Sequence, residues 1–230
     1  MLMVHVIKIS GHELDQPTAL QALVETLQLQ TGKVVLVHGG GSVLPRALSA
    51  IGGPTAPAAA EIAAMALRGG INPRLVAALI QHRLQAIGLC GIDLELMYIQ
   101  RGDDQPVVRF EVLHYLLEQQ WLPVLAPIAL HVATNCGVLL NADSAAHIVA
   151  SALGADMLTF VISTPGVFSD GKRITGISAR QFERYINQGV IDAAYASVVR
   201  AAAHAAPFVG KVRITDVENL DSEVGTVVVA

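Results

Sequence analysis

A lysine lies near the end of one predicted strand, and a run of glycines follows another. Both residue types can hold phosphate. Lys8 stands near the end of an apolar strand expected over residues 4–9. Gly39, Gly40 and Gly41 follow a continuous apolar run over residues 34–37, which is typical of a parallel strand buried on both faces. A buried lysine is costly without an anion, and ligands gather at the carboxyl ends of strands in open α/β sheets. The pattern therefore predicts an anion site where these two strands end.

The glycine run gives the chain conformational freedom and leaves no Cβ between the backbone and a ligand. We expect Ser42 to cap the helix that follows, whose free amides and dipole would favour an anion. However, the sequence GGGS matches neither GxGxxG nor GxxxxGK[ST]. A tight strand-to-helix turn with no ligand therefore remains an alternative.

Predicted strands and helices alternate along the whole chain, which predicts an α/β fold with a mainly parallel open sheet. One helix is expected to begin at Asp15 or Thr18 and to run to about residue 29. Another is expected over residues 57–68, where Gly69 and Gly70 should stop it before Asn72 caps the next. Hairpins are expected over residues 94–110 and 167–174, a short strand over 138–140, and closing strands over 211–214 and 225–229.

Composition excludes several classes of protein. The 230 residues are 53% hydrophobic and carry a formal net charge of -4, which argues against nucleic acid or an anionic membrane surface as a main partner. The amino-terminal residues lack a basic region, and no apolar run reaches membrane-spanning length, so a cytoplasmic location is expected. Cys90 and Cys136 make neither a disulfide framework nor a metal-ligand cluster, so no metal held by the protein is expected.

Four short motifs, taken in order, resemble the amino acid kinase family and most of all its acetylglutamate kinases. They are Lys8-Ile9-Ser10-Gly11, His38-Gly39-Gly40-Gly41, Asn141-Ala142-Asp143 and Ser163-Thr164-Pro165-Gly166. The resemblance covers nearly the whole chain and implies a three-layer αβα sandwich, as in carbamate kinase, within a single domain over residues 1–230. It also implies an acceptor lobe over about residues 1–153, a nucleotide lobe over about 154–230, and a homodimer or a dimer-based oligomer.

The implied reaction is transfer of the γ-phosphoryl group of ATP to a carboxylate of an acidic amino-acid derivative, in arginine- or lysine-type biosynthesis. The Mg²⁺ ion would arrive with ATP rather than on protein ligands. By resemblance, Lys8 stabilises the transferring phosphoryl group, and Asp143 orients the lysines. The implied phosphate- or substrate-binding residues are Gly11, Gly39, Gly40, Gly41 and Asn141. The implied nucleotide-binding residues are Ser163 and Gly166.

The chain departs from the family at positions that matter for function. Val198 stands where the family has a second catalytic lysine, Leu139 replaces a substrate asparagine, and Ile162 replaces a small polar residue. Residues 52–57, which include Pro54, lack the arginine that grips the substrate carboxylate in acetylglutamate kinases. Lys211 is a candidate to supply the missing charge from the next segment. Three hypotheses follow: an active carboxylate kinase, a catalytically impaired paralogue that binds nucleotide or anion as a regulatory or partner subunit, or a scaffold with an empty cleft.

Overall fold

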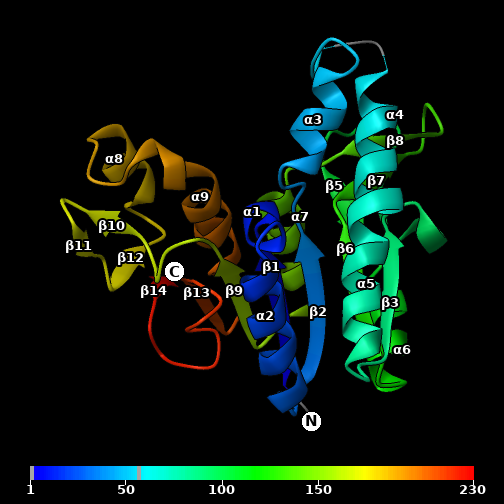
Figure 1. The fold of residues 1–230 in the computed structure, drawn as a ribbon. Coiled ribbons are helices and arrows are strands. Elements are labelled where there is room, and N and C mark those ends of the chain that lie inside the picture. The colour runs from blue at the N-terminus through cyan, green and yellow to red at the C-terminus, as the bar shows by residue number, and fades with distance from the viewer. Residues whose placement is uncertain (1–2, 56–57) are drawn as a thin grey trace.

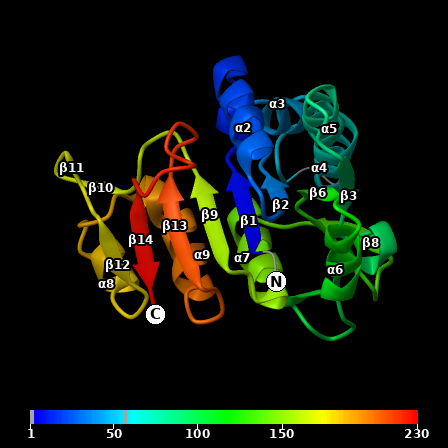
Figure 2. The ribbon, with the colours of Figure 1, turned by 90° about the horizontal axis from the view of Figure 1, so that it is seen from below.

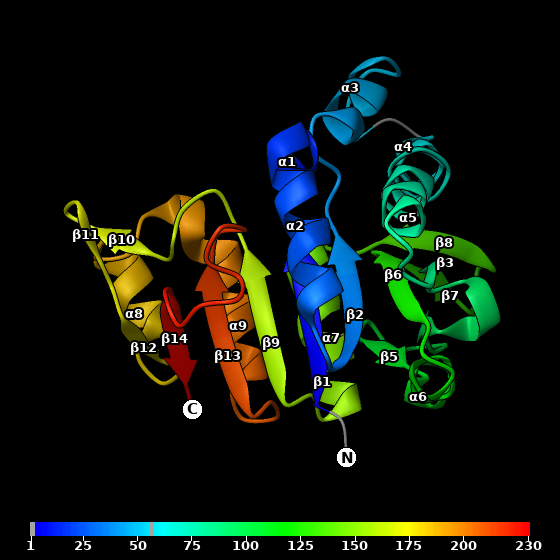
Figure 3. The same cartoon turned by 60° about the horizontal axis from the view of Figure 1, so that its bottom comes forward.

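An eight-stranded sheet organises the molecule, with the strand order β12-β14-β13-β9-β1-β2-β6-β3 (Figures 1 and 3). The computed structural model describes residues 3–55 and 58–230. Every neighbouring pair in this sheet is parallel except β13 and β14, which confirms the expected mainly parallel sheet. The strands are β1 (Val4–Ile9), β2 (Lys33–His38), β3 (Ala86–Cys90), β6 (Leu122–Ala126), β9 (Met157–Val161), β12 (Gly176–Ser178), β13 (Lys211–Thr215) and β14 (Thr226–Val229).

Helices cover both faces of the sheet, because successive strand residues point to opposite sides (Figure 2). On β1, Val6 belongs to a core shared with α6, α7 and α9, whereas Ile7 belongs to a second core shared with α2 and α5. The predicted three-layer αβα sandwich is therefore confirmed. The helices are α1 (Gly11–Leu14), α2 (Pro17–Leu29), α3 (Val43–Ser49), α4 (Ala59–Ala64), η1 (Met65–Ile71), α5 (Asn72–Gln81), η2 (Asp93–Glu95), α6 (Phe110–Glu118), α7 (Ala142–Leu153), α8 (Phe182–Asn187), η3 (Ala193–Tyr195) and α9 (Ala196–Ala205).

Two smaller sheets stand apart from the large one. The first has the order β5-β4-β7-β8, built from β4 (Met97–Ile99), β5 (Pro106–Val108), β7 (Ile128–His131) and β8 (Cys136–Leu139). It contains the hairpin expected over residues 94–110, but β7 was not predicted because only Pro127 separates it from β6. The second is the expected hairpin of β10 (Phe168–Ser169) and β11 (Lys172–Arg173).

The helix expected over residues 57–68 does not stop at Gly69 and Gly70, so this prediction was wrong. Residue 57 lies outside the described residues, and α4 runs directly through the π-helical segment η1 into α5. Asn72 does not cap a new helix, because its buried side-chain amide donates to Val124 O at 2.9 Å. The wider π turn therefore carries the chain past both glycines while Asn72 anchors the helix to the sheet.

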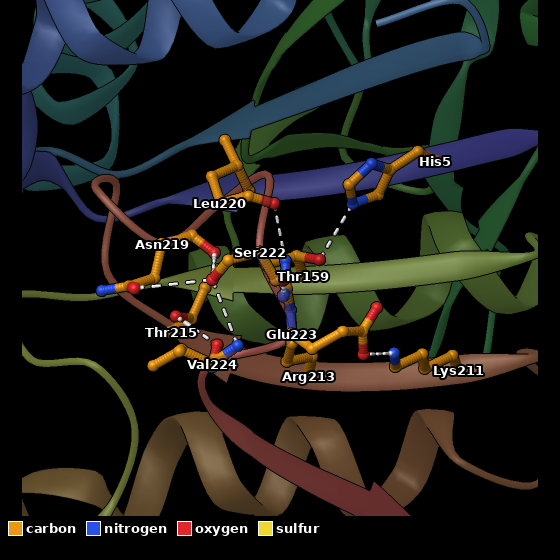
Figure 4. Close-up of polar contacts among 10 residues, drawn as sticks. All are labelled: His5, Thr159, Lys211, Arg213, Thr215, Asn219, Leu220, Ser222, Glu223 and Val224. Carbon is orange, nitrogen blue, oxygen red and sulfur yellow. Dashed lines mark hydrogen bonds and ion pairs between the residues drawn. The ribbon is translucent and has the colours of Figure 1, made fainter.

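A buried arginine fixes the loop that joins β13 to β14 (Figure 4). Arg213 is 2% exposed, and its guanidinium donates to Leu220 O at 2.7 Å and also to Ser222 O. On the neighbouring strands, the side chains of His5 and Thr159 meet with 2.9 Å between Nε2 and Oγ1. Lys211, at the start of β13, pairs with Glu223 of the same loop. The contacts of Arg213 and Lys211 therefore hold the loop against β13.

The sheet is continuous across the lobe boundary that the sequence predicts. Strands β1, β2, β3 and β6 come from residues before 154 and the other four from residues after it, and β1 pairs directly with β9. That the first lobe binds the acceptor and the second binds the nucleotide remains a prediction. Among the described residues, no helix has both the length and the apolar character needed to cross a bilayer.

Candidate active site at the carboxyl edge of the sheet

A buried ion pair joins the central strand to the helix that covers it. Lys8 lies between Val37 of β2 and Phe160 of β9, on the face of β1 that α7 covers. Its Nζ is 2.7 Å from Oδ1 of Asp143, in the first turn of α7, and the two side chains are 9% and 12% exposed. Because each charge has lost most of its water, the pair holds both groups at the end of β1. The structure thus places Asp143 against Lys8, which is the contact that the family resemblance implied.

Two glycine turns interlock beside this ion pair, one after β1 and one after β2. A Cβ built on Gly11 would lie 1.8 Å from the backbone nitrogen of Gly41. Gly41 has a φ of 49°, and its own Cβ would lie 2.4 Å from Gly11 O. Glycine is therefore required at both positions by the close approach of two backbones, whether or not a ligand binds.

The amides of this turn are not equivalent. Gly39 N donates to Ile9 O at 3.1 Å, so this amide is already occupied in linking the two strand ends. Within residues 3–55 and 58–230, the amides of Gly11, Gly40 and Gly41 donate to no acceptor. These three amides have no hydrogen-bond acceptor in the described part of the chain, whereas Gly39 has a structural role.

Ser42 does not cap α3, so that prediction was wrong. Its side chain makes no capping hydrogen bond, and its backbone nitrogen instead donates to Oδ2 of Asp15 at 2.6 Å. Asp15 or Thr18 was expected to open α2, but that helix begins at Pro17 and follows Gln16. A carboxylate therefore already faces the start of α3, and an anion would depend on the glycine amides and Lys8 rather than on the dipole of this helix.

A buried, neutral histidine forms a hydrogen bond with the backbone of the glycine turn. His38 is fully buried, and its Nδ1 is 3.1 Å from Gly39 O while its Nε2 is 3.1 Å from Nδ2 of Asn72. An amide nitrogen can only donate, so Nε2 accepts and Nδ1 carries the proton. Burial lowers the pKa of His38 to about 4, with a smaller opposing effect from its bond to Gly39. This network was not predicted, because the local sequence at Asn72 is typical of a helix cap.

The start of α7 forms a second hydrogen-bonded chain around Asp143. Asn141 caps the helix, with its Oδ1 accepting from Asp143 N at 2.9 Å and Ser144 N at 3.1 Å. Its Nδ2 donates to Ser197 Oγ at 3.2 Å, and Ser197 Oγ donates to Oδ2 of Asp143 at 2.7 Å. The implied substrate residue Asn141 is thus also a structural cap. Ser197 was missed, although its position beside Val198 could have drawn attention to it.

No second cation contacts Asp143 in the described part of the chain. Val198 is 5% exposed and belongs to the core beneath α7 and α9. Lys211 pairs in register with Met157, at the opposite end of β9 from the site, and its charge is paired with Glu223. Arg200 pairs with Glu183 at 2.9 Å. The expectation that Lys211 supplies the missing charge was therefore wrong, because three residues of strand, or about 10 Å, separate it from the level of Lys8.

The turn after β9 lies at the same edge of the sheet as Lys8 but faces different surroundings. Ser163 is exposed and lines a hollow together with Glu13, Asp216 and Glu218. The pKa of Glu13 is raised mainly by burial, with further contributions from the other two carboxylates. This hollow is acidic and would repel phosphate.

Gly166 has a structural reason to be glycine. Its φ is 124°, and a Cβ there would lie 2.8 Å from Oγ1 of Thr226. That hydroxyl accepts from Val167 N at 2.8 Å, which ties the turn after β9 to the start of β14. The proposed nucleotide role of Gly166 therefore remains an expectation rather than a requirement of its geometry.

The residues at the site suit a metal ion that arrives with a nucleotide rather than one held by protein ligands. Among the described residues, no group of three His, Cys, Asp or Glu side chains gathers as a metal site requires. Both oxygens of Asp143 are engaged, one by Lys8 and one by Ser197. An Mg²⁺ ion would therefore have to find its ligands mainly among phosphate oxygens and water, as it often does.

Comparisons with known proteins agree with this geometry. The model of the amino acid kinase family matches residues 3–216. Acetylglutamate kinase of Chloroflexus aurantiacus is 37% identical, over 88% of this chain and 87% of its own. Acetylglutamate kinase of Roseiflexus castenholzii is 38% identical, over 98% and 93%. The chain therefore belongs to the amino acid kinase family.

Solved structures extend the comparison to the fold. The smu.665 protein of Streptococcus mutans is 25% identical, with a TM-score of 0.84 over 99% of this chain and 98% of its own. Giardia carbamate kinase is 15% identical, with a TM-score of 0.74 over 99% and 98%. The carbamate kinase-like fold is confirmed. Together with the family match, these findings support an ATP-dependent carboxylate kinase.

Proposed function

We propose that this protein transfers the γ-phosphoryl group of ATP to the side-chain carboxylate of an N-acetylglutamate-like amino acid. The observation that carries the proposal is the Lys8–Asp143 ion pair beside the unoccupied amides of Gly11, Gly40 and Gly41. The chain also keeps 37–38% identity to acetylglutamate kinases over most of its length. The product of such a transfer is an acyl phosphate.

The geometry suits the main difficulty of this reaction, which is that donor and acceptor are both anionic. The Lys8 ammonium would lie against the transferring phosphoryl group, and the three amides would donate to its oxygens as charge develops. Asp143 would hold the ammonium in place without contacting phosphate. Mg²⁺ bound to ATP would neutralise part of the phosphate charge.

The acceptor end is where this chain should differ most from acetylglutamate kinases. A surface hollow beside α3 is lined by Leu44, Pro45, Leu48, Ser49, Gly52, Gly53 and Pro54. None of these side chains carries a charge, so this wall offers nothing to pair with a second carboxylate of the acceptor. We therefore propose that the wall beside α3 does not select for the α-carboxylate of the acceptor.

Several further parts of the proposal follow from the family. The acceptor would occupy the lobe of about residues 1–153 and the nucleotide that of about 154–230, with Ser163 and Gly166 near the nucleotide and Asn141 near the acceptor. The protein would act as a homodimer or dimer-based oligomer in the cytoplasm, without nucleic acid or membrane as a partner. The net charge of -4 supports this choice of partners.

A second candidate function is a regulatory or partner subunit that binds nucleotide or anion without efficient transfer. The observation that favours it is the charge balance: Val198 is buried and apolar, and Asp143 contacts one cation in the described part of the chain.

The decisive experiment is an ADP-release assay with ATP and Mg²⁺ across a panel of carboxylates. The panel should contain N-acetylglutamate, N-acetyl-2-aminoadipate, glutamate and aspartate, with Lys8→Ala as the control. Turnover with an amino-blocked acceptor that is lost in Lys8→Ala supports the kinase. Tight ATP–Mg²⁺ binding by calorimetry without turnover on any acceptor supports the second candidate.

A further inference from the structure

We propose that Ser197 is a positioning residue, which fixes the Asp143 carboxylate so that the Lys8 ammonium stays at the glycine turn. The proposal rests on the proposed kinase function for its catalytic consequence. Ser197 lies in the first turn of α9 and was not among the site residues predicted from the sequence. Its importance comes from what its hydroxyl contacts.

The hydroxyl of Ser197 has two partners on α7. It donates to Oδ2 of Asp143 at 2.7 Å and receives the Nδ2 donor of Asn141 at 3.2 Å. A serine hydroxyl has one donor and can accept, so both bonds can exist together. The contacts form a chain from Asn141 through Ser197 and Asp143 to Lys8.

The two oxygens of Asp143 therefore have different tasks. Oδ1 faces the ammonium of Lys8 at 2.7 Å, and Oδ2 is held by Ser197. Without the second contact, the carboxylate could rotate about its terminal bond, because that torsion is soft. Rotation would move Oδ1 and, with it, the position of the Lys8 ammonium. A hydrogen bond to a charged acceptor is strong enough to restrict it.

Ser197 restrains Asp143 without adding charge. Beside the Lys8–Asp143 ion pair, the Ser197 hydroxyl and the glycine amides are therefore neutral donors. Ser197 itself is exposed, whereas Asp143 is buried, so the hydroxyl stands between the buried carboxylate and the solvent. We therefore expect Ser197 to affect the rate of transfer more than the binding of ATP.

The test compares Ser197→Ala with Ser197→Thr in steady-state kinetics. We expect Ser197→Ala to lower kcat about tenfold, corresponding to about 1.4 kcal/mol, with the KM for ATP changed less than about threefold. Ser197→Thr keeps the hydroxyl and should stay within about threefold of the native kcat. Ser144→Ala is the matched control, because it removes an exposed hydroxyl beside Asp143 that forms no side-chain hydrogen bond in the described part of the chain.

A double-mutant cycle separates the positioning role from a general effect on packing. In the Asp143→Ala background, Ser197→Ala should have no further effect on kcat. Equal losses in both backgrounds, a native kcat in Ser197→Ala, or loss in Ser197→Thr as large as in Ser197→Ala would each overturn the proposal.

The same cycle, read by urea unfolding, distinguishes this proposal from the proposed function. The losses of unfolding free energy caused by Ser197→Ala and by Asp143→Ala should not add in the double variant, because one hydrogen bond links the two residues. Non-additive folding with no turnover on any acceptor would overturn the kinase function and, with it, the catalytic role of Ser197. Additive folding effects in an active enzyme would overturn the Ser197 proposal alone.

Discussion

The Nζ of Lys8 lies 2.7 Å from Oδ1 of Asp143, which connects the end of the central strand β1 to the first turn of α7. Both side chains are nearly buried, at 9% and 12% exposure. The pair therefore has two consequences, one for the rate of phosphoryl transfer and one for the stability of the fold.

The stability consequence can be measured with Lys8→Met. The substitution leaves the Asp143 carboxylate buried without its partner, and breaking a buried pair in this way typically costs about 3–5 kcal/mol. The double variant Lys8→Met/Asp143→Leu removes both charges, so it should unfold at a higher urea concentration than the single variant. A double variant that is less stable than the single one would contradict the view that the unpaired buried carboxylate causes the loss of stability.

A gain of activity is expected from Val198→Lys. The resemblance places a second catalytic lysine at this position, and one well-placed donor at a reacting oxygen changes kcat by about 100-fold or more in favourable cases. We expect kcat in the ADP-release assay to rise at least about tenfold.

The matched control for this variant is Val199→Lys, which places the same charge at a fully buried neighbour. It should destabilise the protein without raising kcat. A folded Val198→Lys protein with native or lower kcat would contradict the view that missing positive charge limits the reaction.

Gly11→Ala should disrupt the interlocked turns. Its Cβ would lie 1.8 Å from Gly41 N, so the two strand ends would have to separate, and we expect a loss of several kcal/mol in the free energy of unfolding. Gly69→Ala is the control, because nothing lies within 4 Å of its added Cβ. In a helical segment this change should stabilise the protein by about 0.5–1 kcal/mol. Equal melting temperatures for the two variants would contradict the close approach.

The buried histidines make the free energy of unfolding depend on pH. Burial lowers the pKa of both His5 and His38 from 6.5 to about 4, so below pH 6.5 the unfolded chain binds protons that the folded chain does not. Stability should therefore be full above pH 6.5 and fall as the pH drops towards about 4.

Urea titrations between pH 4 and 7.5 test this slope. His38→Gln removes one of the two titrating groups, so the unfolding free energy of this variant should change less with pH than that of the native protein. A native protein whose unfolding free energy stays constant over this range would contradict the assignment of neutral, buried imidazoles.

Strands β1, β2, β13 and β14 of the large sheet lie where the sequence predicted strands, whereas β12 was not predicted. Lys8 and Asp143 could be placed at strand and helix ends, and their contact was implied by the family resemblance. The role of Asn72 could not be predicted, since a side chain that anchors a π-helical segment to the sheet has the same local sequence as a helix cap.

The details of the site depended on contacts between distant segments. Asp15 reaches Ser42 and Ser197 reaches Asp143 across the fold, and neither pairing has a local signal. Lys211 failed as the missing cation because the register of β13 against β9 places it at the wrong end of the sheet. Such outcomes depend on register and topology rather than on residue type.

The most direct test of the central claim is to trap the acyl phosphate with hydroxylamine, which converts it to a hydroxamate. The native protein, incubated with ATP, Mg²⁺ and N-acetylglutamate, should form hydroxamate in step with ADP, and Lys8→Met should form neither above background. Release of ADP without hydroxamate on every acceptor, or equal hydroxamate formation by Lys8→Met, would contradict a carboxylate kinase whose reaction depends on Lys8.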